Sequence, residues 1–160
     1  MKITKELLKE KGACADGYRD FLKEYPVDKY PDGVEYQELL DCCAEKNFSY
    51  GSWLLGAFGK TVEVRKIEGD LIVEEGIIFA GQLEVKGCIK AGCGIKAGDG
   101  IEAGWGIEAG DGIEAGCEYG IYAGLRCRIT NKTQRKIIAK KRPENIMCGE
   151  FEENKDDAVR

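Results

Sequence analysis

The stretch GIKAGDGIEAGWGIEAGDGIEAG, residues 94–116, repeats one six-residue unit almost four times. Gly, Ile, Ala and Gly recur in each unit, and only the residue between Ile and Ala and the residue between the two glycines change. The period begins before the glycines do. Large aliphatic residues recur every six positions at Leu71, Ile77, Leu83, Ile89, Ile95, Ile101, Ile107 and Ile113.

This spacing predicts very short strands. Side chains two apart on a strand share a face, so the Ile and Ala of each unit point to one side and the charged residue between them points to the other. A three-residue strand cannot bury its inner face alone, but coils stacked about 4.8 Å apart can. We therefore expect a β-solenoid over residues 61–130, continuing after an insertion at Glu118–Tyr119 into Ile121 and Ala123.

The number of units in one coil stays open. Three units make an 18-residue coil, which would place Lys90 on Glu108 and Lys96 on Glu114. Two units make a 12-residue coil, which would place Lys90 on Glu102 and Lys96 on Glu108. Both arrangements pair opposite charges on neighbouring strands. The 12-residue alternation of Cys, Asp and Trp between the glycines keeps the flatter coil as an alternative, because these residues do not suit the interior of a narrow prism.

Residues 1–60 have the pattern of a small helical head. Thr4 is a candidate N-cap for KELLKEK, DGYRDFLKEY ends at Pro26, and YQELLDCCAEK is a third amphipathic segment. SYGSWLLGAFG follows Ser49, a further N-cap candidate, and contributes Trp53 and Leu54 to the expected core. The predicted fold class is α+β: a helical head, a β-solenoid and a basic C-terminal cap with an acidic tail over residues 131–160.

The charge of the chain is unevenly distributed. The sequence has 24 basic and 29 acidic residues and a net charge of −5, but residues 99–118 contain acids and no base. The segment that follows contains bases and no acid: Arg126, Arg128, Lys132, Arg135, Lys136, Lys140, Lys141 and Arg142. We interpret KTQRKIIAKKR as an amphipathic helix that caps the solenoid, with a nucleic-acid site as the alternative. The tail beyond Phe151 is expected to fray.

Composition excludes several classes of function. The sequence has no His, which removes the commonest general base and zinc nitrogen ligand. Its 8 Cys include no C-x-x-C pair, so we expect reduced thiols, no metal site and no cofactor. No apolar run approaches the roughly 18 residues of a membrane-spanning helix, and MKITKELLKEKG is not a secretory signal, so we expect a cytoplasmic protein.

The repeat resembles hexapeptide-repeat proteins in general, and it is closer to small phage- and prophage-encoded proteins in which a helical head precedes runs of G-I-x-A-G. The segment ACADGYRDF, residues 13–21, matches their A-C-x-x-G-x-x-x-F signature. The resemblance covers residues 3–125. It implies this architecture and a phage origin. It also suggests a protein that blocks a host defence effector, such as a CRISPR nuclease, by binding it.

The sequence therefore predicts a non-catalytic interaction protein and a homodimer. Acids at regular spacing can imitate a row of phosphates, and Trp and Tyr are frequent interface anchors. The candidate partner-binding residues, taken as one acidic solenoid face, are Trp105, Asp99, Glu102, Glu108, Asp111, Glu114, Tyr119 and Tyr122. The alternatives are nucleic-acid binding through the basic segment and a self-assembling structural β-helix. A hexapeptide acyltransferase is disfavoured, since the enzymes that this repeat resembles depend on a His base.

Overall fold

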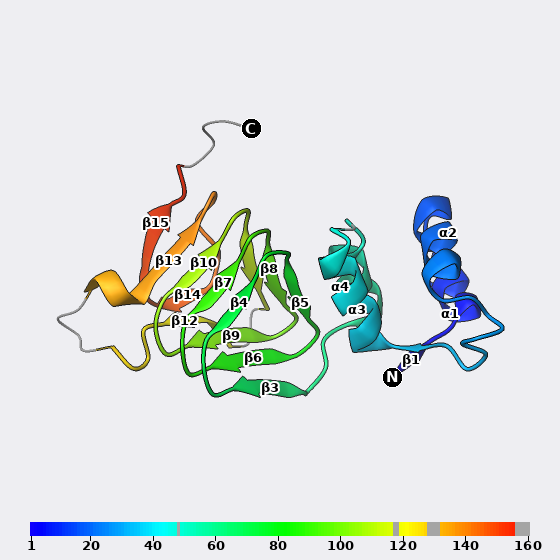
Figure 1. Cartoon of the computed structure of the whole chain (residues 1–160), viewed down its shortest axis with the longest axis horizontal. Coiled ribbons are helices and arrows are strands. Elements are labelled where there is room, and N and C mark those ends of the chain that lie inside the picture. Colours follow the sequence, from blue (N-terminus) through cyan, green and yellow to red (C-terminus); the bar gives the residue numbers. More distant parts are fainter. Residues whose placement is uncertain (48, 117–118, 128–131, 156–160) are drawn as a thin grey trace.

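A computed structural model of the chain describes residues 1–47, 49–116, 119–127 and 132–155. A helical head lies at one end and a β-solenoid forms the rest, so the predicted fold class is confirmed (Figure 1). No helix in the described ranges is long and apolar enough to cross a membrane.

The head consists of two helical pairs. The first pair is α1 (Lys5–Glu10) and α2 (Ala15–Glu24), and the second is α3 (Tyr36–Glu45) and α4 (Gly51–Phe58). The two-residue strands β1 (Lys2–Ile3) and β2 (Val34–Glu35) pair antiparallel and join the two halves.

Local capping explains where two of these helices begin. The Thr4 side chain accepts a hydrogen bond from the Leu7 N–H (3.2 Å), as expected for an N-cap. The Cys14 Sγ accepts one from the Gly17 N–H (3.4 Å) at the start of α2. The expected cap at Ser49 is wrong, because α4 begins one residue later, after Tyr50. Leu54 is buried in the core of the head, and Trp53 is partly buried against it.

The solenoid strands form three parallel sheets. Each of the first three coils contributes one strand to each sheet, and within the described residues the last two coils contribute strands to two of the sheets. The first sheet contains β3 (Val64–Ile67), β6 (Gln82–Val85), β9 (Gly100–Ala103), β12 (Gly120–Ala123) and β14 (Ile146–Cys148). The second contains β4 (Leu71–Val73), β7 (Ile89–Ala91), β10 (Ile107–Ala109), β13 (Lys136–Ala139) and β15 (Glu150–Glu153). The third contains β5 (Ile77–Phe79), β8 (Ile95–Ala97) and β11 (Ile113–Ala115).

The register selects the 18-residue coil. Ile77 pairs with Ile95, and Ile95 pairs with Ile113, so each strand lies on the strand three units away. Lys90 and Glu108 form an ion pair across the coils at 3.0 Å. The variable residue between the glycines lies at a corner of the coil and not in its interior. Trp and Asp at this position therefore do not have to fit inside the 18-residue coil.

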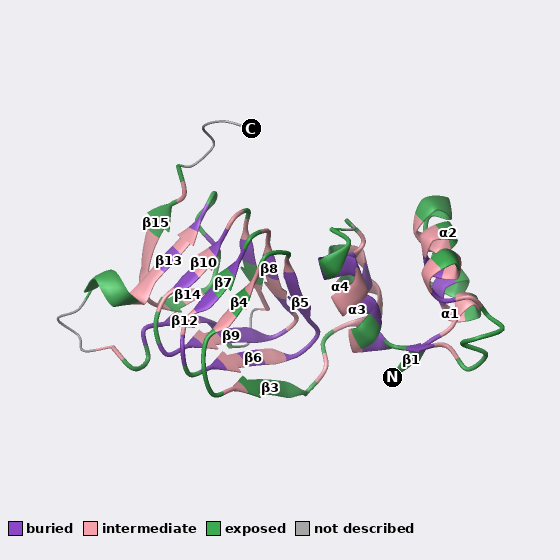
Figure 2. Ribbon diagram, in the orientation of Figure 1, coloured by how far each residue is buried: buried purple, intermediate pink, exposed green. Residues whose placement is uncertain are grey.

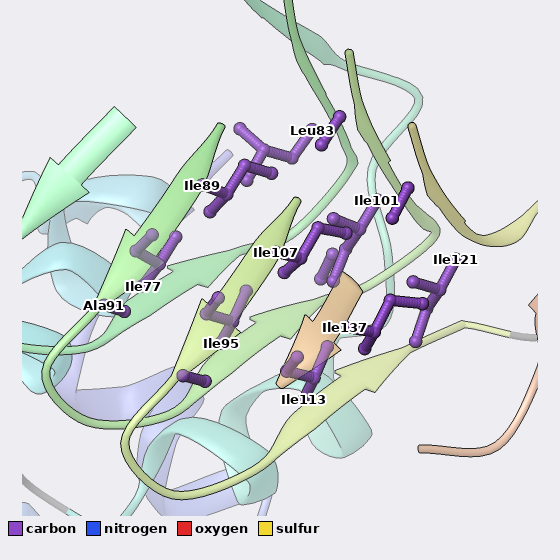
Figure 3. Close-up of a cluster of buried hydrophobic side chains, with 14 of the residues drawn as sticks. Ile77, Leu83, Ile89, Ala91, Ile95, Ile101, Ile107, Ile113, Ile121 and Ile137 are labelled. Atoms are coloured by element: carbon purple, nitrogen blue, oxygen red, sulfur yellow. The ribbon is translucent and has the colours of Figure 1, made fainter. Parts of the chain in front are cut away.

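The side chains of the repeat alternate as predicted. Ile and Ala are buried on every strand from β7 to β10, and the residue between them is more exposed (Figure 2). The isoleucines from the three sheets point toward one another and fill the interior (Figure 3). Burying each of these side chains stabilises the solenoid by about 1.5–3 kcal/mol before the cost in chain entropy.

One of the two glycines is required by close approach of the backbone. A Cβ on Gly110 would lie 1.9 Å from the Gly92 carbonyl oxygen of the preceding coil, whereas a Cβ on Gly112 would meet no atom within 4 Å. At this corner the glycine that follows Ala is therefore required by coil stacking, and the glycine that precedes Ile is not.

The head closes part of the first coil. The Gln37 side-chain amide in α3 donates to the Ile78 carbonyl (2.7 Å), and its oxygen accepts from the Ala80 N–H (3.1 Å). The amide thereby provides the two hydrogen bonds that a preceding strand would give to β5, and it protects this sheet edge from pairing with another chain.

The C-terminal region differs from the expected cap. The interpretation of KTQRKIIAKKR as an amphipathic helix is wrong, because a single 3₁₀ turn (Lys132–Arg135) leads into β13, which pairs with β10. β15 then pairs with β13, so the expected fraying directly after Phe151 is also wrong. The solenoid thus continues well beyond residue 130. Arg128, Ile129, Cys117, Glu118 and residues 156–160 lie outside the described part of the chain.

Candidate binding site in the helical head

The acids expected to form one face of the solenoid lie on all of its sides. Six residues are one third of an 18-residue coil, so consecutive units place their variable residues on different sheets. Glu102 lies on β9, Glu108 on β10 and Glu114 on β11, and Asp99 and Asp111 lie at two different corners. The single acidic face is therefore wrong for the described coils.

Four of these five acids form ion pairs, and the fifth, Glu102, accepts a hydrogen bond. Glu114 pairs with Lys96 (3.1 Å), as Glu108 does with Lys90, and Asp111 pairs with Lys140 (3.2 Å). Asp99 is only 8% exposed and pairs with Lys60 (3.0 Å). Glu102 accepts a hydrogen bond from the Gln82 amide (2.9 Å). The solenoid does not present a row of free carboxylates in the described residues.

The aromatic candidates are separated as well. Trp105 is 38% exposed at the corner between β9 and β10, next to Leu125, which is 51% exposed one coil further on. Tyr119 is 49% exposed just before β12, and Tyr122 on β12 lies in register with Glu102 on β9, the adjacent strand of the same sheet. Trp105 and Leu125 form a small apolar corner, and the two tyrosines do not extend it.

The basic candidates are mostly paired within the last coils. Glu150 accepts from Arg135 (2.9 Å) and lies 3.6 Å from Lys132. The hydrogen bond from Arg135 holds the pKa of Glu150 below its ordinary value. Lys136 pairs with Glu152, Lys140 pairs with Asp111, and the Arg142 guanidinium lies 5.8 Å from the centre of the Phe151 ring. Arg126 and Lys141 are exposed, and Arg128 lies outside the described residues.

The head contains a cavity of about 410 Å³ between its two helical pairs. We call this space the head cavity. Its lining is mainly apolar and aromatic and comes from all four helices and their connections: Leu8, Gly12, Ala13, Cys14, Gly17, Asp20, Phe21, Glu24, Tyr25, Leu39, Cys42, Cys43, Ser49, Tyr50, Trp53 and Leu54.

The A-C-x-x-G-x-x-x-F signature lies on the wall of this cavity. Ala13, Cys14, Gly17 and Phe21 all line it. There is little space at Gly17, because an added Cβ would lie 3.3 Å from the Tyr50 ring and 3.4 Å from the Cys14 sulfur. The glycine lets Tyr50 of the second helical pair lie directly on α2.

Two polar contacts join the helical pairs on either side of the cavity. The Tyr50 hydroxyl donates to Asp20 (3.0 Å), which raises the pKa of Tyr50 above its ordinary value. Lys46 forms an ion pair with Glu24 (2.5 Å), and this hydrogen bond raises the pKa of Lys46. Both pairs are accessible to solvent at the rim, so their contribution to stability is small.

The thiols in the lining differ in their environment. Burial raises the pKa of Cys43 to about 12, so it is a neutral side chain at physiological pH. Cys14 is exposed and caps α2. No group of three or more His, Cys, Asp or Glu residues is arranged to hold a metal ion within the described ranges.

A second depression continues from the head cavity and shares Glu24, Tyr25 and Cys42 with it. We call it the acidic groove. It is lined by Glu24, Tyr25, Gln37, Glu38, Asp41, Cys42, Glu45 and Lys46. Four of these residues are carboxylates and one is a lysine. Sequence reasoning missed this site, although acids at positions 38, 41 and 45 have the spacing of one helix face.

Comparison with known proteins finds one similarity, and it is confined to the N-terminal part of the chain. Residues 1–62 are similar to the YdhT N-terminal domain. No curated protein matches the chain, and no solved structure matches it. The matched segment contains every residue that lines the head cavity and the acidic groove, and it ends just before the solenoid strands begin. The candidate site therefore lies entirely in the part of the chain that is similar to the YdhT N-terminal domain.

Proposed function

We propose that this chain is a non-catalytic binding protein whose head cavity receives an apolar group of a protein partner. The cavity carries the proposal. Its volume of about 410 Å³ lies in the range of binding pockets, which are mainly apolar and contain a few polar groups that fix orientation. Tyr50 and Trp53 supply aromatic surface in its wall, and Asp20 and Glu24 supply polar groups at its rim.

The solenoid supports this role as a rigid body attached to the head. The Glu108 and Glu114 carboxylates are neutralised by lysines on neighbouring coils, and the core is continuous from the first coil to the last. A surface built on stacked coils loses little conformational entropy when a partner binds. The corner of Trp105 and Leu125 offers a second contact surface, since both large apolar side chains are exposed on adjoining coils.

Inhibition of a host defence effector, including a CRISPR nuclease, is the narrower form of this proposal. It rests on the resemblance to phage-encoded proteins. If the protein imitates nucleic acid, the head is the better candidate, because Glu38 and Glu45 are exposed beside the head cavity. A cytoplasmic location and a homodimer belong to the same proposal.

A neutral apolar probe tests the binding function. N-phenyl-1-naphthylamine becomes fluorescent when it leaves water, and we expect saturable fluorescence with the wild-type protein. The substitution Cys42→Phe fills space in the cavity wall and abolishes that signal, whereas Cys42→Ser leaves the space open and retains it. Circular dichroism confirms that both variants are folded. Equal probe binding by the two variants would place the binding elsewhere and refute the proposal.

A further inference from the structure

We infer that the partner segment is a cationic amphipathic α-helix, which places an aliphatic or aromatic anchor in the head cavity and Lys or Arg side chains along the acidic groove. This inference rests on the proposed function and adds the chemistry of the partner.

The two depressions form one surface with two different properties. They share Glu24, Tyr25 and Cys42 in their walls, so a partner whose anchor enters the cavity has the groove directly beside it. The cavity wall is apolar, and the adjoining groove is acidic. A ligand that matches both must combine an apolar anchor with positive charge.

Carboxylates lie at helical spacing on both α2 and α3. Asp20 and Glu24 are four residues apart on α2, and Glu38, Asp41 and Glu45 lie at positions i, i+3 and i+7 of α3. Glu24 is paired with Lys46, and Asp41 accepts from Gln37 (2.8 Å) and lies 3.7 Å from Arg65. Glu38 and Glu45 are exposed. These two carboxylates give the groove its excess negative charge, which attracts a cationic partner.

The walls favour a helix over an extended peptide. An extended peptide gains affinity by main-chain hydrogen bonds to a sheet edge, but this surface is built from helices whose backbone groups bond within each helix. Recognition therefore depends on side chains. An amphipathic helix presents side chains at i, i+3, i+4 and i+7, which suits a groove of this kind.

Two stapled helical peptides of 15 residues test the inference. Both carry the same Leu and Phe residues on one face, and they differ only in flanking Lys or flanking Glu residues. Fluorescence anisotropy with labelled peptides measures binding to the full chain at about 50 and 300 mM salt. We expect the Lys peptide to bind at least 10-fold more tightly than the Glu peptide and to weaken as salt increases, because the paired charges are exposed.

A charge-neutral variant and a matched control locate the effect. The double substitution Glu38→Gln with Glu45→Gln is expected to weaken the Lys peptide about 5- to 10-fold and to leave binding of N-phenyl-1-naphthylamine unchanged. The control, Glu74→Gln with Glu75→Gln, removes two exposed carboxylates from a solenoid corner and is expected to have no effect.

The outcomes separate the two proposals. Equal affinity for the Lys and Glu peptides, or no change in the Glu38 and Glu45 variant, would overturn the inference while the binding function stands. Probe binding without binding of either peptide would also overturn it. If neither the probe nor a peptide binds, the proposed function fails as well.

Discussion

The two glycines of the repeat provide a stringent test of the coil structure. Gly110 and Gly112 flank the same corner residue, and neither has a positive φ. A Cβ on Gly110 would lie 1.9 Å from the Gly92 carbonyl oxygen, and a Cβ on Gly112 would meet no atom within 4 Å. The substitution Gly110→Ala should therefore destabilise the protein, whereas Gly112→Ala should not.

The distances set the size of the effect. A carbon–oxygen contact is normally no closer than about 3.3 Å, so Gly110→Ala must separate the coils locally by about 1.4 Å. This separation lengthens the hydrogen bonds from the Gly110 N–H to Ala91 (3.0 Å) and from the Asp111 N–H to Cys93 (3.3 Å). Two hydrogen bonds at about 1 kcal/mol each and overpacking of about 1–3 kcal/mol give a loss of about 3–5 kcal/mol.

Urea unfolding followed by circular dichroism measures this loss. Gly112→Ala is expected to change the free energy of unfolding by less than about 1 kcal/mol, and it can be stabilising because alanine restricts the unfolded chain. Since solenoids can unfold in segments, the midpoint of the transition is compared as well as the extrapolated free energy. Equal stability of the two variants would refute the stacking that the structure shows at this corner.

Other predictions concern the head and the assembly. Gln37→Ala removes the hydrogen-bond partners of the Ile78 carbonyl and the Ala80 N–H and should lower the free energy of unfolding by about 2–4 kcal/mol in the same urea assay. An unchanged midpoint would mean that water replaces the amide. Exposed Cys14 should react with a maleimide long before buried Cys43 in the native protein, as followed by mass spectrometry; equal rates would contradict the burial of Cys43. Burial raises the pKa of Cys43 from 9.0 to about 12, so the folded state holds the thiol proton more tightly than the unfolded chain does. This contribution to the free energy of unfolding is complete below pH 9 and is lost as the pH rises toward 12. Urea midpoints should therefore fall between pH 8 and pH 10.5, with a smaller fall in Cys43→Ala. Light scattering should give twice the chain mass of 17.6 kDa if the protein is a homodimer, and 17.6 kDa would contradict that expectation.

The sequence was sufficient to predict the solenoid because its signal is local and repeated. Ile and Ala two apart and a constant period of six require stacked short strands. The size of the coil could not be derived in the same way, since both coils pair Lys90 and Lys96 with glutamates. Trp105 kept the 12-residue coil as an alternative, because in the 18-residue coil a residue at this position was expected to point inward. The structure places Trp105 at a corner of the 18-residue coil.

The C-terminal strands could have been found from a signal that was present. Residues 137–139 read Ile-Ile-Ala, which repeats the Ile-x-Ala spacing without its glycines. The surrounding basic residues favoured a helix instead. Tertiary pairing with β10 determines the outcome, because Ile137 and Ala139 are buried in line with the preceding coils.

The candidate site was only partly predictable. The A-C-x-x-G-x-x-x-F segment was used for the resemblance alone and not as a site, although the structure places its Cys14 and Gly17 in the wall of the head cavity. The cavity itself depends on how far α2 lies from α3 and α4, which no local pattern encodes. The acidic solenoid face failed for a geometric reason, since a six-residue spacing rotates by a third of a coil at each step.

The central claim is that the head, and not the solenoid, binds the partner. The most direct measurement is capture of a partner from host lysate by wild type, Cys42→Phe, Cys42→Ser and Trp105→Ala, at low and high salt, with identification of the captured protein. We expect wild type, Cys42→Ser and Trp105→Ala to capture the same protein and Cys42→Phe to lose it. High salt should weaken this binding. Retention by Cys42→Phe together with loss in Trp105→Ala would place the interface on the solenoid corner and contradict the account.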